Sequence, residues 1–176
     1  GITGILHFNK IPEAPQRVRA MTNAIAHRGP DAEGFYDEPA VALGHRRLSI
    51  IDLSGAANQP FIDPTGNYVM VFNGEIYNYL ELKQQLSDYP FTTSSDTEVL
   101  MAAFCKWGID CVKVLEGMFA FAIWDKRNET LWLARDRMGV KPLYFFRSEN
   151  AFAFSSEKRS LLASSLINPS IDQQSL

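Results

Sequence analysis

The apolar run at residues 118–124 (MFAFAIW) is the feature that most limits how this chain can fold. Phe119, Phe121 and Ile123 alternate with Ala120 and other apolar residues, so both faces of a strand here would be hydrophobic. Such a strand must be covered on both sides. A polar turn and a second apolar run at residues 130–134 (TLWLA) indicate a hairpin.

Further elements follow from the same kind of pattern. We expect strands at residues 1–8, 33–36, 41–51, 68–72, 143–147 and 151–155, and helices at residues 16–27, 79–86, 95–107 and 156–163. Strands apolar on both faces, together with a few helices, predict two stacked sheets with helices outside, a layered α+β domain. The length of 176 residues suits one domain with a short tail, and the polar stretch 164–176 is the expected tail.

Composition argues against several classes of function. The net charge is −3 and there is no basic run, which disfavours nucleic acid or an anionic membrane as a partner. No apolar stretch approaches the roughly 20 residues needed to span a bilayer, and no secretory signal is apparent. Cys105 and Cys111 lack metal-ligand spacing, and three scattered histidines suggest no zinc site. We expect reduced thiols and a cytoplasmic protein.

Asn73 and Gly74 follow the apolar run at residues 68–72 and have two interpretations. Asn-Gly is first of all a turn sequence, because both residues tolerate positive φ. Alternatively, the Asn73 side-chain amide and the unshielded Gly74 N–H are adjacent donors that could stabilise an oxyanion.

Arg47 and Asp96 are similarly ambiguous. Arg47 lies in an expected strand, where its guanidinium group is either solvated at a sheet edge or aimed into a cleft to bind a carboxylate. Asp96 follows Ser95, which forms a capping box with Glu98, and an acid in the first turn of a helix stabilises the helix dipole. Asp96 is therefore either part of a helix start or a ligand-binding carboxylate.

Eight motifs, in order and spanning nearly the whole chain, resemble the class II (N-terminal-nucleophile) glutamine amidotransferase domain of glutamine-hydrolysing asparagine synthetases. These motifs are GITGI at 1–5, HRGPD at 27–31, RLSIID at 47–52, NGEIYN at 73–78, SDTE at 95–98, GMFAFA at 117–122, RD at 135–136 with GVKPLY at 139–144, and SSE at 155–157. The resemblance implies a four-layered αββα sandwich, the N-terminal-nucleophile hydrolase fold. It also implies an amidotransferase domain over residues 1–163 and, from residue 164, a linker to a C-terminal synthetase domain.

The resemblance implies that a cysteine directly before Gly1 is the nucleophile, with its own α-amine as the base. Neither Cys105 nor Cys111 matches that position. Asn73 and Gly74 would form the oxyanion hole. The alternative is a catalytically inactive scaffold domain without the cysteine, as in proteins resembling β-lactam synthetase.

The other implied site residues bind glutamine. Arg47 would bind its α-carboxylate, and Glu75 and Asp96 would bind its α-ammonium group. The remaining pocket residues would be Leu48, Ser49, Ile50 and Ile51.

The domain itself would need no cofactor or metal, and ATP and Mg²⁺ would serve the synthetase domain of the same chain. That second domain would receive the ammonia and choose its acceptor. The resemblance leaves a homodimer open.

Overall fold

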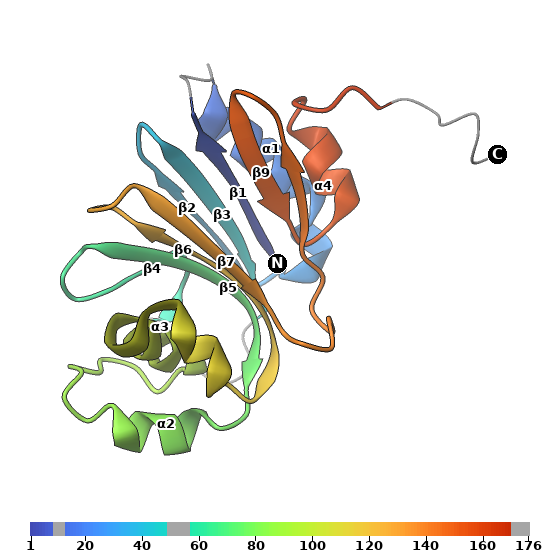
Figure 1. Ribbon diagram of the computed structural model, residues 1–176. Helices are drawn as coiled ribbons and strands as arrows, with labels where there is room; N and C mark the ends of the chain where they lie inside the picture. Colours follow the sequence, from blue (N-terminus) through green and yellow to red (C-terminus); the bar gives the residue numbers. More distant parts are fainter. Residues whose placement is uncertain (9–12, 49–56, 170–176) are drawn as a thin grey trace.

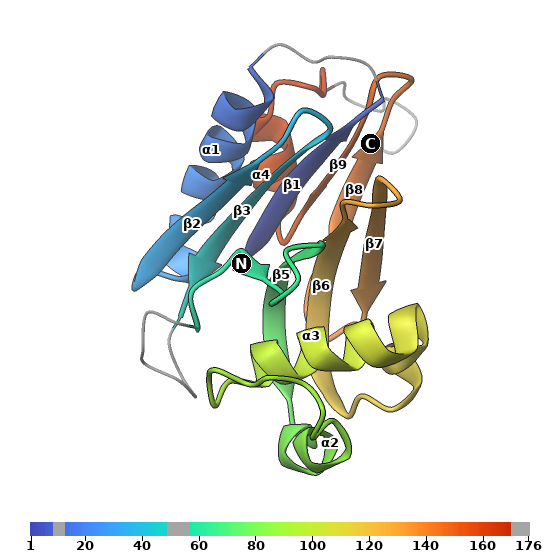
Figure 2. The same ribbon diagram turned by 90° about the vertical axis from the view of Figure 1, so that its left-hand side faces the viewer.

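Two antiparallel sheets form the centre of the molecule (Figures 1 and 2). The computed structural model describes residues 1–8, 13–48 and 57–169. The first sheet has the strand order β2 (Ala32–Asp37), β3 (Val41–Arg47), β1 (Ile2–His7), β9 (Ala151–Ser155) and β8 (Tyr144–Arg147). The second has the order β4 (Phe61–Ile62), β5 (Tyr68–Ile76), β6 (Gly117–Asp125) and β7 (Thr130–Arg135).

Helices cover the outer face of each sheet. On the first sheet these are α1 (Ala14–Ala24), the 3₁₀ turn η1 (Ala26–Arg28) and α4 (Lys158–Ala163). On the second they are α2 (Tyr79–Gln85), α3 (Asp96–Trp107) and the 3₁₀ turn η3 (Gly108–Lys113). The four layers run helices, sheet, sheet, helices, so the expected αββα sandwich is confirmed. Within the part of the chain that the structure describes, no helix is long and apolar enough to cross a membrane.

Strand β6 has both faces buried, as its sequence predicts. Phe121 and Ile123 pack with α3 in the outer core, whereas Ala122 and Trp124 belong to the core between the two sheets. All four side chains are at most 1% exposed. Burial of each large one contributes about 1.5–3 kcal/mol to folding, so this strand holds both halves of the core together.

Several boundaries differ from the sequence-based expectation. The first helix begins at Ala14, with Pro15 in its first turn, and ends at Ala24 instead of residue 27. Gly29, which follows this region, has an extended φ of −171°, and a Cβ there would lie 2.4 Å from the carbonyl carbon of Arg46. Gly29 thus permits close backbone packing, a requirement that local sequence does not reveal. Strand β3 ends at Arg47.

Candidate active site

A cavity of about 240 Å³ lies where the start of β1, the end of β3, the middle of β5 and the start of α3 meet. This is near the lower end of typical small-molecule sites, which span about 300–1,000 Å³, so it suits a small ligand. Its charged lining residues are Arg28, Arg46, Arg47, Lys141, Glu75 and Asp96. Both signs of charge in one small cavity are complementary to a zwitterion.

Asn73 and Gly74 lie inside β5 and do not form a turn. They pair with Ala120 and Phe119 of β6, and the strand continues to Ile76. The turn interpretation and the predicted strand end at residue 72 are therefore wrong. A Cβ at Gly74 would lie 2.3 Å from the Met118 carbonyl oxygen, so glycine is needed here for close strand packing.

Two hydrogen-bond donors of β5, the Gly74 N–H and the Asn73 side-chain amide, face this cavity. Phe72 N–H donates to Gln59 Oε1 (2.6 Å) and Ile76 N–H to Asp96 Oδ2 (3.0 Å), both on the edge of β5 away from β6. Because backbone groups alternate along a strand, the Gly74 N–H points to that same edge. The side-chain nitrogen Nδ2 of Asn73 is buried and has no hydrogen-bond partner among the described residues. Because buried donors are normally hydrogen-bonded, we expect a ligand to accept from this one.

Arg47 is 8% exposed and lies on a strand inside the sheet, between β2 and β1, so the solvated edge-strand interpretation is wrong. Its Nη1 donates to Asn58 Oδ1 (2.6 Å), which orients the guanidinium group at the cavity wall. Leu48 also lines the cavity and is 57% exposed. Three predicted pocket residues, Ser49, Ile50 and Ile51, lie outside the described residues.

Asp96 is the buried acid of the cavity, at 6% exposure, and opens α3. Burial and the nearby charge of Glu75 raise the pKa of its carboxyl, against hydrogen bonds from the Ile76 and Thr97 N–H groups. A cationic group bound here would favour the ionised form and offset that raised pKa. Ser95 caps the helix by accepting from Glu98 N–H (3.2 Å), as predicted. The Glu98 carboxylate instead accepts from Thr92 and Thr93, so the reciprocal half of the capping box is absent.

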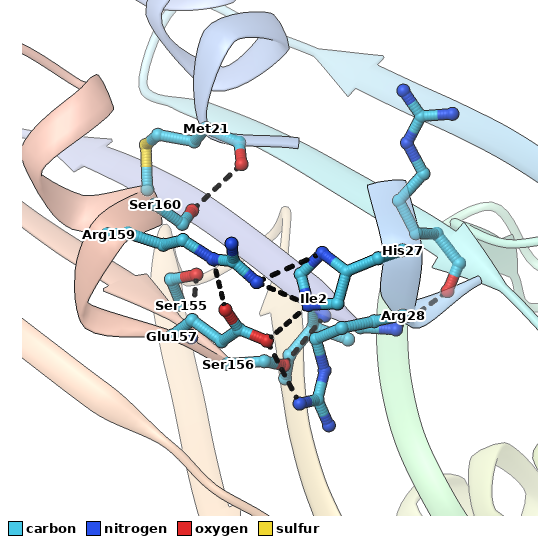
Figure 3. Close-up of polar contacts among 11 residues, drawn as sticks. Ile2, Met21, His27, Arg28, Ser155, Ser156, Glu157, Arg159 and Ser160 are labelled. Carbon is cyan, nitrogen blue, oxygen red and sulfur yellow. Dashed lines mark hydrogen bonds and ion pairs between the residues drawn. The ribbon is translucent and has the colours of Figure 1, made fainter. Parts of the chain in front are cut away.

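The first residues of β1 are fixed from two directions. Gly1 exchanges backbone hydrogen bonds with Arg46 of β3, at 2.6 and 2.8 Å. Ile2 N–H donates to the Ser156 hydroxyl (2.9 Å), and Ser156 N–H donates to the Ile2 carbonyl (2.9 Å; Figure 3). These hydrogen bonds fix the start of the strand at the cavity.

Next to Ser156, the carboxylate of Glu157 accepts hydrogen bonds from three side chains (Figure 3). It accepts from His27 Nε2 (2.8 Å), Arg28 Nη1 (3.1 Å) and Arg159 Nε (2.5 Å). Burial raises the pKa of this carboxyl, but hydrogen bonds from Arg159, His27 and Arg28 outweigh burial and lower the pKa to about 2. This anion fixes Arg28, which forms part of the cavity wall.

Three cavity residues have no clear signal in the sequence: His45, Gln59 and Lys141. Nε2 of His45 donates to the Phe72 carbonyl (3.1 Å), and burial lowers the pKa of its imidazole well below the usual value, so the ring is neutral. Gln59 supports β5 by accepting from Phe72 N–H. Both contacts join separate parts of the chain and depend on the stacking of the sheets, which no local pattern encodes.

Comparison with known proteins gives a match over residues 1–176 to the family described as a glutamine amidotransferase domain. The chain is 41% identical over 186 residues to the putative asparagine synthetase [glutamine-hydrolyzing] 2 of Methanocaldococcus jannaschii, covering 96% of this chain and 36% of that protein. It is 42% identical over 169 residues to asparagine synthetase [glutamine-hydrolyzing] 1 of Bacillus subtilis, covering 92% and 26%. The chain thus spans only 26–36% of the length of these curated relatives.

The fold is also found in a solved structure. The glutamine phosphoribosylpyrophosphate amidotransferase of B. subtilis, complexed with ADP and GMP, superposes with a TM-score of 0.77 over 93% of this chain and 43% of that one. At 24% sequence identity this likeness establishes the fold alone. The expected fold and family are confirmed: the chain belongs to the glutamine amidotransferase domain family and has the fold of the N-terminal-nucleophile hydrolases.

Proposed function

We propose that this domain hydrolyses glutamine to glutamate and ammonia in the cavity between β1, β3, β5 and α3. The observation that carries the proposal is the buried Nδ2 of Asn73, which has no partner among the described residues and lies next to a Gly74 N–H that points to the cavity edge of β5. Two fixed donors side by side suit the oxyanion that forms when a nucleophile attacks an amide carbon.

The charges support glutamine as the ligand. Arg47 would bind the α-carboxylate, since its planar fork matches a carboxylate. Glu75 and Asp96 would bind the α-ammonium group, and Leu48 with Ser49, Ile50 and Ile51 would complete the pocket wall. An amino acid offers one anion and one cation, and the cavity supplies the opposite charge for each.

The nucleophile of the proposed reaction is the thiolate of a cysteine directly preceding Gly1. Its sulfur would attack the side-chain amide carbon, and the carbon–nitrogen bond would break as ammonia leaves with a proton from the cysteine's own α-amine. Water would then cleave the glutamyl thioester to give glutamate and the free thiol. Gly1, fixed by Arg46, would hold that cysteine at the cavity.

The ammonia would pass to an ATP- and Mg²⁺-dependent synthetase domain of the same chain. Support comes from the curated relatives, which are named glutamine-hydrolysing asparagine synthetases and of which this chain covers only 36% and 26%. Aspartate is the proposed acceptor, and a cytoplasmic location and a homodimer belong to the same proposal. Residue 163 as the end of the domain, with a linker from residue 164, stays a prediction.

The test begins with an intact mass and N-terminal sequence of the full-length protein, followed by a glutaminase assay. With a cysteine before Gly1, Asn73→Ala should lower kcat about 10²–10³-fold with little change in KM, because the lost donor acts mainly on the oxyanion. Asn67→Ala is the matched control, since its side-chain amide donates to Thr65 on an exposed turn and does not line the cavity.

Two results would contradict the proposal. One is no glutaminase activity in a protein that carries the cysteine, which would favour an inactive scaffold. The other is an unchanged kcat in Asn73→Ala, which would remove the oxyanion hole from these residues.

A further inference from the structure

The segment between β7 and β8 is organised around one buried carboxylate. Asp136 is 6% exposed and accepts from three backbone N–H groups: Phe119 (3.2 Å), Val140 (2.8 Å) and Lys141 (3.0 Å). Burial raises the pKa of its carboxyl, but these hydrogen bonds outweigh burial and lower the pKa below its usual value, so the group is ionised. The segment is therefore tied to β6 in a fixed conformation.

This attachment positions Lys141 relative to the proposed oxyanion hole. Phe119, which Asp136 contacts through both its backbone and its carboxylate, is the β6 partner of Gly74. Arg135 closes the segment from the other side by donating from Nε to the Lys141 carbonyl (2.6 Å). Lys141 lines the same cavity as Gly1 and Asn73.

Lys141 differs from Arg28 and Arg46, two other cations of the cavity, in its pairing. Arg28 is paired with Glu157 (3.1 Å) and Arg46 with Glu33 (2.7 Å). Among the residues that the structure describes, no carboxylate lies within ion-pair distance of the Lys141 ammonium group. Its positive charge is therefore less offset locally than those of Arg28 and Arg46.

The charge of Lys141 contributes to the electrostatic potential at Gly1. Burial, together with the positive charges of Arg28 and Lys141, lowers the pKa of an amino group at Gly1 to about 5, against the opposing charge of Glu157. The remaining titratable groups of the cavity wall are neutral His45, the cations Arg46 and Arg47 on β3, Glu75 on β5 and Asp96 on α3. The anions Glu75 and Asp96 are those assigned to the substrate ammonium group.

We propose that Lys141 belongs to the active site, where its ammonium group stabilises the thiolate of the nucleophile directly preceding Gly1. This inference rests on the proposed function, because that function supplies the thiol. A neighbouring lysine favours the thiolate over the neutral thiol, and the thiolate is the nucleophilic form. The buried carboxylate of Asp136 holds the segment so that this charge is in place before substrate binds.

The test measures the thiol directly, in the full-length protein with a cysteine, native or inserted, before Gly1. Iodoacetamide alkylation of the N-terminal peptide is followed by mass spectrometry from pH 5 to 10. In Lys141→Met the midpoint of the alkylation curve should move about 0.5–1 pH unit higher, as expected for losing one nearby positive charge. Lys141→Arg should restore it.

Two controls separate the electrostatic role from a structural one. Lys113→Met removes an exposed lysine that pairs with Asp110, outside the cavity, and should leave the curve in place. Alkylation of Cys111 in η3 should be equally slow in every variant, since its thiol is buried away from the cavity and becomes accessible only on unfolding.

Coincident curves for Lys141→Met and wild type would overturn the inference. The proposed function is judged separately, by glutaminase turnover in the same wild-type protein. A normal turnover with an unshifted curve refutes only the role of Lys141. A shifted curve without turnover supports Lys141 and refutes the hydrolysis.

Discussion

At the scale of single residues, the carboxyl group of Asp96 is the most sensitive to pH in the proposed pocket. Its pKa is raised by burial and by Glu75, so it takes up a proton at a higher pH than the usual value of about 3.9. Only the ionised form attracts an ammonium group. Binding of glutamine is therefore expected to weaken as the pH falls through this raised pKa.

The prediction concerns KM across the acidic range in the full-length enzyme. The wild-type KM for glutamine should rise as pH is lowered from 7 toward 4. Asp96→Asn should raise KM at pH 7 by about 10–150-fold, the loss expected for a hydrogen bond to a charged group, and should flatten the pH dependence. A variant with the wild-type pH profile would remove Asp96 from the ammonium site.

The sequence identifies Arg47 and Asp96 as candidates, but local pattern cannot choose between their two roles. Arg47 lies at the end of an internal strand and Asp96 opens a helix 49 positions later. Their meeting at one cavity depends on how the two sheets stack, which is a tertiary property. Lys141 lies within the GVKPLY motif, but a lysine in a polar loop is usually solvated, so the sequence alone gives it no role.

At the scale of elements, β5 shows where local preference and pairing disagree. Asn-Gly favours a turn, yet nine residues of β5 pair in register with β6 and carry the dipeptide through as extended strand. The gain from continuous pairing and burial outweighs the local preference. Helix α2 and both hairpins, whose local and tertiary signals agree, are found where the sequence predicts them.

Gly74→Ala tests this account of β5. The added methyl group would lie 2.3 Å from the Met118 oxygen and 2.7 Å from the Phe119 Cα, so the strands must separate locally. We expect a loss of about 1–3 kcal/mol in the free energy of unfolding, as for other overpacked sites, measured by urea denaturation. Gly66→Ala, in an exposed turn with open space around it, is the comparison.

The two glycine variants should differ in their effect on both stability and activity. Gly66 has a φ of 71°, so alanine there costs only the strain of a left-handed backbone and leaves the cavity intact. Gly74→Ala should also abolish most turnover, because its N–H shifts with the strand. Equal stability and equal activity in the two variants would show that β5 and β6 are not packed as described.

At the scale of the whole molecule, the hydrophobic core is divided into three layers that share strands. Phe154 of β9 packs between the sheets, whereas Ala151 and Ala153 of the same strand face α1 and α4. Removing β9 would open two layers at once and leave β1 paired only with β3. The free energy lost with these contacts is large compared with the total stability of a domain, which is about 5–15 kcal/mol.

A chain ending at residue 143 is therefore expected not to fold, although it keeps every residue assigned to the substrate pocket. A chain ending at residue 169 should show the cooperative thermal transition and near-UV circular dichroism of a packed core. The shorter chain should show neither. A cooperative transition in the 143-residue chain would mean that the second sheet is stable without β8 and β9.

The pair of hydrogen bonds between Ser156 and Ile2 also affects the order in which the domain can assemble during synthesis. The two residues are 154 positions apart, so the start of β1 stays without this partner until nearly all of the domain has left the ribosome. Once Ser156 emerges, its two hydrogen bonds with Ile2 fix the start of β1 from its second side. The proposed active site therefore takes its final form only at the end of the domain's synthesis, so a nascent chain that stops short of Ser156 should be inactive even though it carries every residue assigned to the pocket.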